Sequence, residues 1–272
     1  GIDLHSNNCV IVVTDETDRI VYRRRVANEL ALVLASLEPY RAQLAAVAVE
    51  STYNWYWLVD GLQAAGYAVR LANTAGMKRY EGLKYSDDDS DAWYLAHLLR
   101  LGILPTGYIC PIEWRAVRDL ARKRLQLTRS RTQHILAVES NIARHSGAKI
   151  ASRAVKALTE TAVQAELAHL HEDVRYAIGA NVAVIQTLST QIKKLEARLR
   201  SQVHPRDEFC LLTSVPGIGE ILASTVMLET ASIERFAAVG NYASYARCVD
   251  SKRLSNNKKK GQGNVKNGNQ YL

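Results

Sequence analysis

Four acidic residues stand where a folded chain could bring their carboxylates to one place. Asp3 interrupts the apolar start of the chain, where a carboxylate is costly unless it has a partner or a metal ion. Glu50 ends an apolar run, and Asp88 and Asp91 are spaced so that both can project from one face of a helix. Together these carboxylates could bind two Mg²⁺ ions that hold a phosphate and stabilise the oxygens exchanged in a displacement.

Each acid also has a plainer interpretation. Asp88 and Asp91 can belong to an acidic first turn favoured by the helix dipole, and Glu50 can be a surface acid. Asp3 is the hardest of the four to explain without a function. No other enzyme motif competes with this set, because the chain has no glycine-rich phosphate loop, no nucleophile elbow and no His-Glu-x-x-His.

The elements that must position these acids alternate between strand and helix in residues 1–108. The sequence predicts a hairpin followed by helix, strand, helix, strand and a last helix, which is the order of a ribonuclease-H-like mixed sheet. We expect Asn28 to cap the first helix and Gly66 to end the second. Asp3 is expected in the first strand, between Ile2 and Leu4. The further predicted strands are 9–13, 20–22, 44–49 and 69–71, and the predicted helices are 28–37, 55–65 and 90–101.

The middle of the chain, residues 109–205, is expected to be helical. Long helices are predicted over 114–143 and 161–202. The second carries an alternation of four- and three-residue apolar steps, with Asn181 as its polar position, which predicts a coiled-coil seam and self-association. The alternative is a helical hairpin within one chain. The seam consists of Val174, Ile178, Asn181, Ile185, Leu188, Ile192, Leu195 and Leu199.

Basic residues give the chain a net charge of +8 and gather in two segments. In the helix 114–143 they predict a stripe that faces phosphates, although a solvated helix face is the alternative. Near the C-terminus they lie in a glycine- and asparagine-rich segment that we expect to be flexible and to fold only on a polyanion. The predicted nucleic-acid ligands are Arg118, Arg122, Lys123, Arg129, Lys252, Arg253, Lys258, Lys259, Lys260 and Lys266.

The stretch Pro216–Gly219 resembles the turn of a helix–hairpin–helix module, in which the amides of Gly217 and Gly219 hold a phosphate. An ordinary tight connection between helices is the alternative. The chain has no run of about 20 apolar residues, so no membrane span is expected. Its Cys residues have no paired spacing and no secretory signal is seen at the start, which predicts reduced core thiols and a cytoplasmic protein.

Two sets of motifs resemble the DEDD transposases of the insertion-sequence 110 family. The first set comprises Gly1–His5, Glu50–Thr52 and Asp88–Ala92, and the second comprises Pro216–Gly219, Ala243–Ala246 and Lys266-x-Gly268-Asn269-x-x-Leu272. The resemblance implies a RuvC-like, ribonuclease-H-like domain at 1–108 and a C-terminal transposase domain at 206–272. The helical pattern between them predicts a coiled-coil oligomerisation segment at 109–205. The resemblance places the catalytic, Mg²⁺-binding tetrad on Asp3, Glu50, Asp88 and Asp91.

The resemblance further implies a recombinase guided by a structured bridge RNA that pairs with target and donor DNA. Such a protein acts as a homo-oligomer, a dimer or a tetramer, and forms a covalent phosphoserine intermediate with DNA. Ser255 is the favoured nucleophile, because its distance to Gly268 and Asn269 suits the family pattern, and Ser251 is its competitor. Two alternatives remain: a RuvC-like junction endonuclease without a covalent intermediate, and a non-catalytic nucleic-acid-binding relative.

Overall fold

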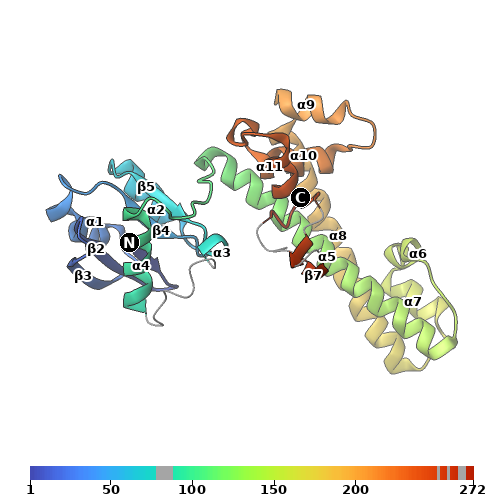
Figure 1. Cartoon of the computed structure of the whole chain (residues 1–272). Helices are drawn as coiled ribbons and strands as arrows, with labels where there is room; N and C mark the ends of the chain where they lie inside the picture. Colours follow the sequence, from blue (N-terminus) through green and yellow to red (C-terminus); the bar gives the residue numbers. More distant parts are fainter. Residues whose placement is uncertain (78–87, 250–251, 256–257, 263–267) are drawn as a thin grey trace. The chain divides into compact units, whose positions relative to one another are not determined.

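The computed structural model describes residues 1–77, 88–249, 252–255, 258–262 and 268–272. The chain divides into two compact units (Figure 1). The first comprises Gly1–Cys110 with Asp250–Gly268, and the second comprises Pro111–Val249 with Asn269–Leu272. The helical second unit therefore follows a first unit that contains the predicted mixed sheet.

The first unit is built on a five-stranded sheet with the strand order β3-β2-β1-β4-β5. The first three strands pair in antiparallel fashion, whereas β1, β4 and β5 are parallel. This mixed sheet is consistent with the ribonuclease-H-like arrangement expected from the sequence. The strands are β1 (Ile2–Leu4), β2 (Asn8–Thr14), β3 (Ile20–Ala27), β4 (Val47–Glu50) and β5 (Val69–Ala72).

Helices cover both faces of the sheet, because alternate strand residues point to opposite sides. Ile2, Val47 and Val49 pack with the helices α1 (Leu30–Leu37) and α2 (Tyr56–Ala64). Val10 and Ala48 face the other side, where α4 (Asp88–Arg100) packs. The short helices η1 (Glu38–Tyr40) and α3 (Thr74–Met77) complete this part of the unit.

The ends of the first two helices were predicted with mixed success. Gly66 follows α2 with a φ of 86°, in the left-handed region that favours glycine, so the predicted helix end is confirmed. The prediction that Asn28 caps α1 is wrong. The N-cap of α1 is Glu29, without a side-chain hydrogen bond. The Asn28 amide instead donates to the carbonyl of His5 over 3.0 Å, because the fold brings this side chain to the turn after β1.

The turn between β2 and β3 is joined to α4 by Asp18. Its carboxylate lies 2.5 Å from Nδ1 of His97 and 3.1 Å from Nε of Arg100. Asp18 has a φ of 72°, which asparagine also tolerates, so Asp18→Asn removes the charge and leaves the backbone unstrained. We expect this variant to lose about 1–2 kcal/mol of unfolding free energy in urea titrations. Asp173→Asn, at an exposed aspartate, is the control, and equal stability of the two variants would contradict the prediction.

The second unit is organised around two long helices, α5 (Ile112–Ser146) and α8 (Glu172–Val203), which lie side by side (Figure 1). Shorter helices pack at both ends of this pair. They are α6 (Ser152–Ala157) and α7 (Glu160–Glu166) at one end, and α9 (Asp207–Thr213), α10 (Glu220–Thr230), η3 (Ile233–Arg235) and α11 (Val239–Tyr245) at the other. No helix in the described ranges is both long and apolar enough to cross a membrane.

The prediction of one continuous helix over 161–202 is wrong. α7 ends at Glu166, and α8 starts at Glu172 after an N-cap at His171, whose ring nitrogen accepts a hydrogen bond from the amide of Asp173. Leu167 and Leu170 of the intervening turn are buried in the same core as α5 and α8. The apolar spacing therefore continues across the break between α7 and α8. There, the buried leucines hold α7 where it packs back against α8.

The predicted seam lies on α8 and packs within the chain. Ile178 and Ile185 are buried in one core with Ile135 and Val138 of α5. The polar seam residue Asn181 lies with its Oδ1 2.9 Å from Nδ1 of His134, which is also on α5. This contact is therefore a helical hairpin within one chain. The hairpin was the alternative to a coiled-coil seam between chains.

Candidate active site

The sheet brings two of the predicted acids next to each other. Ile2 of β1 pairs with Val49 of the parallel strand β4, so the next residue of each strand, Asp3 and Glu50, are also neighbours. Both Ile2 and Val49 face the core under α1 and α2. Because strand residues alternate, Asp3 and Glu50 point to the opposite face, which α4 covers.

The helix α4 supplies the other two acids from its first turn. Ala92 packs against Val10 and Val12 on this face of the sheet, and Asp91 directly precedes it. The approach is close, since a Cβ atom at Gly1 would lie 2.0 Å from the carbonyl oxygen of Ala92. Asp88 is the first residue of α4, and its side chain lies outside the described part of the structure. The fold therefore places Asp3, Glu50 and the acidic end of α4 at one side of the sheet.

Asp3 is a buried carboxylate, 3% exposed, with a histidine beside it. Nε2 of His5 lies 3.3 Å from Oδ2 of Asp3. The carbonyl of His5 accepts hydrogen bonds from the amides of both Asn28 and Asn54, at 3.0 and 2.9 Å. These two asparagines fix the turn that follows Asp3. Sequence spacing provides no signal for either role.

The thiols divide into two classes, which corrects the expectation that all are core residues. Cys9 and Cys110 are buried, whereas Cys210 and Cys248 are exposed. Burial, and then the charge of Asp3, raise the pKa of the Cys9 thiol to about 11. At pH 8 we expect Ellman's reagent to label Cys210 and Cys248 quickly and Cys9 only after unfolding. Fast labelling that survives in the Cys210→Ser/Cys248→Ser variant would contradict this expectation.

The acids fit Mg²⁺ by their chemistry, because hard divalent cations prefer carboxylate oxygens. Within the described residues, no three His, Cys, Asp or Glu side chains form a group that could hold a metal ion. Asp3 and Glu50 lie on the sheet face that α4 covers, and Asp91 lies in the first turn of that helix. The carboxylate ligands match the preference of Mg²⁺, but the described side chains do not surround an ion site.

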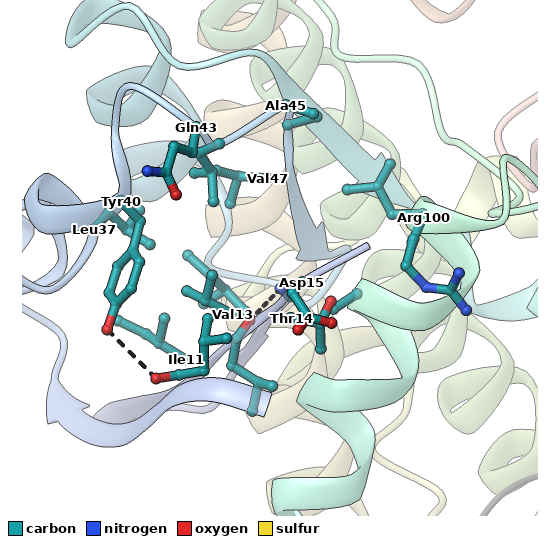
Figure 2. Close-up of a pocket in the computed structure, with 18 of the residues that line it drawn as sticks. Ile11, Val13, Thr14, Asp15, Leu37, Tyr40, Gln43, Ala45, Val47 and Arg100 are labelled. Atoms are coloured by element: carbon teal, nitrogen blue, oxygen red, sulfur yellow. Dashed lines mark hydrogen bonds between the residues drawn. The ribbon is translucent and has the colours of Figure 1, made fainter. Parts of the chain in front are cut away.

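A cavity of about 580 Å³ lies at the other end of the sheet (Figure 2). It is lined by the start of β1, the start of β4 and the end of β2, whereas Glu50 lies at the opposite end of β4 and Asp3 is the residue after Ile2 on β1. Tyr40 and Val47 contribute to its largely apolar wall, and Arg100 lies at its edge (Figure 2). None of the predicted catalytic residues lines it, so this cavity is separate from the acids.

The predicted basic stripe on α5 is partly engaged within the protein. The guanidinium of Arg122 forms a two-fold ion pair with Glu229 of α10, with N–O distances of 2.6 and 2.7 Å. Arg118 is half-buried, whereas Lys123 and Arg129 are exposed. Of these four, the two exposed side chains are best placed to reach a phosphate.

The predicted helix–hairpin–helix turn connects α9 to α10. Gly217 has a φ of 92°, and Gly219 is the N-cap of α10, without a side chain that could cap it. Glu220 at the first position of α10 pairs with Arg200 over 2.8 Å. Arg200 and then His204 hold the pKa of the Glu220 carboxyl below its usual value. The amides of this turn remain predicted phosphate ligands.

The C-terminal basic segment contains a two-stranded hairpin, β6 (Lys252–Ser255) and β7 (Lys258–Gln262). The two strands pair in antiparallel fashion. The expectation that the segment folds only on a polyanion stays a prediction. Ser255 ends β6 and pairs with Lys258, an exposed residue at the start of β7. Arg253 lies on β6, and Lys259 and Lys260 lie on β7. The predicted residues Ser251 and Lys266 lie outside the described residues.

Comparisons with known proteins match both parts of the chain. Residues 1–146 match a family model of IS110-type DEDD transposases, described as "Transposase". Residues 210–272 match a second model, described as "Transposase IS116/IS110/IS902 family". A Pseudomonas aeruginosa protein named "Probable family 20 transposase" is 25% identical over 283 residues, which cover 100% of this chain and 80% of that protein.

Proposed function

The chain belongs to the IS110 family of transposases, and from this premise we propose that it is an RNA-guided, Mg²⁺-dependent DNA recombinase in which Ser255 is the nucleophile. The observation that carries the proposal is the adjacency of Asp3 and Glu50 on the sheet face that α4 covers. A pair of carboxylates at that place suits phosphoryl transfer. The proposed domains are a catalytic domain at 1–108, a helical segment at 109–205 and a serine-bearing domain at 206–272.

In the proposed reaction, Oγ of Ser255 attacks the phosphorus of a DNA phosphodiester. A bond forms between Oγ and phosphorus, the bond to one deoxyribose oxygen breaks, and that oxygen takes up a proton as the serine loses its own. Lys258, the cross-strand neighbour of Ser255, supplies positive charge near the attacked phosphate. Mg²⁺ held by Asp3, Glu50, Asp88 and Asp91 would neutralise the charge on the transferring group.

The phosphoserine preserves the energy of the broken linkage. Attack by a deoxyribose hydroxyl of a second strand restores a phosphodiester and frees the serine. This step needs no external energy source.

The proposed partners are target and donor DNA and a structured bridge RNA. The net charge of +8 and the exposed side chains of Lys123 and Arg129 favour binding of such polyanions. Two DNA sites require more than one catalytic serine, so we propose a dimer or a tetramer.

The test is to express the protein with the DNA that flanks its gene, purify it and sequence the RNA that remains bound. One discrete RNA, with loops complementary to the junctions of the element, is expected. Heterogeneous cellular RNA would contradict RNA guidance.

A suicide DNA substrate then tests the chemistry on a denaturing gel. A covalent adduct that maps to Ser255 by mass spectrometry is expected. Cleavage without an adduct would instead assign a RuvC-like junction endonuclease, and binding without cleavage would assign a non-catalytic nucleic-acid-binding protein.

A further inference from the structure

The chain returns to α11 after the segment that carries Ser255. The backbone amide of Asn269 donates to the carbonyl of Tyr245 over 2.7 Å. The side-chain amide of Asn269 also donates to the Tyr245 hydroxyl over 2.8 Å. Tyr245 is the last residue of α11, so the residues between these two positions form a loop whose two ends meet.

The departing end of the same loop is fixed as well. Arg247 has a φ of 58°, and the amide of Cys248 donates to the carbonyl of Ala243 over 2.8 Å. A left-handed residue with this hydrogen bond is a common way to end a helix sharply. Both the exit and the return of the chain are therefore defined by hydrogen bonds at the end of α11.

Asn269 is anchored to a buried carboxylate. Glu229 of α10 is 3% exposed, and burial of a charge is costly unless the charge is paired and hydrogen-bonded. Its Oε1 accepts from Nε of Arg122, and its Oε2 accepts from Nη2 of Arg122 and from Nδ2 of Asn269, at 2.6, 2.7 and 2.8 Å. The Tyr245 hydroxyl donates to the Glu229 carbonyl over 2.9 Å. α5, α10, α11 and the C-terminal residues thus meet at one residue, Glu229, through its carboxylate and its backbone carbonyl.

The residues after Asn269 are held at the same place. The amide of Tyr271 donates to Oδ1 of Asn269 over 2.9 Å, and the guanidinium of Arg122 lies 4.3 Å from the centre of the Tyr271 ring. Every polar group of the Asn269 side chain therefore has a partner. An alanine at this position would lose all three hydrogen bonds and leave the Glu229 carboxylate short of one donor.

We propose that Asn269 is a positioning residue that closes the base of the Ser255 loop and ties it, through Glu229 and Arg122, to α5. The effect on catalysis rests on the proposed role of Ser255, whereas the closure itself does not. Holding both ends of a segment reduces the arrangements open to it, so the serine reaches the attacking geometry more often.

The experiment compares Asn269→Ala with Asn241→Ala, which replaces an exposed asparagine of α11. Hydrogen exchange reports closure, and the single-turnover rate of adduct formation and the half-saturating DNA concentration report function. We expect Asn269→Ala to speed exchange in β6 and β7 and to lower the adduct rate about tenfold, with half-saturation within about twofold of the control. Exchange in β6 and β7 and an adduct rate that both match Asn241→Ala would overturn the proposal.

A rescue experiment separates positioning from general loss of structure. Asn269→Asp places a second carboxylate beside Glu229 and is expected to be worse than Asn269→Ala. Adding Glu229→Gln restores a donor between the two side chains, and we expect the double variant to recover at least the Asn269→Ala rate. Absence of recovery would count against the pairing.

Two further readouts keep the outcome clear. If Asn269→Asp unfolds α10, Tyr245→Phe, which removes only one hydroxyl of the network, decides the proposal by the same exchange and rate measurements. If the wild-type protein forms no adduct with DNA, the proposed function fails, and hydrogen exchange still decides whether Asn269 closes the loop.

Discussion

Ser255→Ala is expected to abolish the covalent protein–DNA adduct and to lower recombination by about 10³-fold or more, because alanine has no oxygen to attack the phosphate. Ser255 ends β6, and its backbone pairs with Lys258. The substitution removes one exchangeable hydroxyl and leaves this pairing possible, so binding of DNA and RNA should persist. The adduct is measured on a denaturing gel with an end-labelled suicide substrate, and recombination by a two-plasmid assay.

Ser251→Ala is the matched control, four residues earlier in the same basic segment. We expect it to retain adduct formation and recombination within about threefold of the wild type, because Ser255 is the proposed nucleophile. Loss of the adduct in Ser251→Ala with its retention in Ser255→Ala would transfer the nucleophilic role to Ser251. Retention in both variants would exclude a serine intermediate at these positions.

The sheet and its acids were accessible from the sequence because their signals are local. Apolar runs of strand length, separated by helical spacing, predict the strands and helices of residues 1–110. Asp3 stands out because a carboxylate in a buried strand is unusual, and its burial is confirmed. The register that puts Glu50 beside it depends on the pairing of β1 with β4, which no single segment specifies.

The helical unit shows where local patterns mislead. Leu167 and Leu170 continue an apolar spacing that suits a helix, yet the chain turns there and uses both side chains to bury α7 against α8. The same limit applies to charge. Arg122 sits in a run of basic residues typical of a phosphate-binding stripe, but its partner Glu229 lies 107 residues further along the chain. Only the tertiary fold identifies such a pair.

The C-terminal motif identifies a position but not the contacts that its side chain makes. The family resemblance marks the position of Asn269 without giving its physical role. The structure supplies the role through two short hydrogen bonds, to Glu229 and to Tyr245. Neither partner follows from the spacing of the motif, because one lies on α10 and the other on α11.

Asp3→Asn is expected to lower adduct formation by about 10²–10³-fold while preserving the fold. Asparagine has nearly the shape of aspartate, so the packing of β1 against α4 should remain. A neutral amide in place of the buried carboxylate weakens binding of a hard divalent cation. The measurements are the single-turnover adduct rate and the melting temperature with and without Mg²⁺, and we expect Mg²⁺ to raise the melting temperature of the wild type but not that of Asp3→Asn.

The control is Asp173→Asn, which removes an equivalent charge from an exposed position on α8. It should respond to Mg²⁺ like the wild type, so a difference between the two variants reports the site and not the net charge. If Asp3→Asn forms the adduct at the wild-type rate, the acids on the α4 face take no part in the transfer. The serine hairpin with Lys258 would then have to stabilise the phosphate alone, and the adjacency of Asp3 and Glu50 would need a structural explanation.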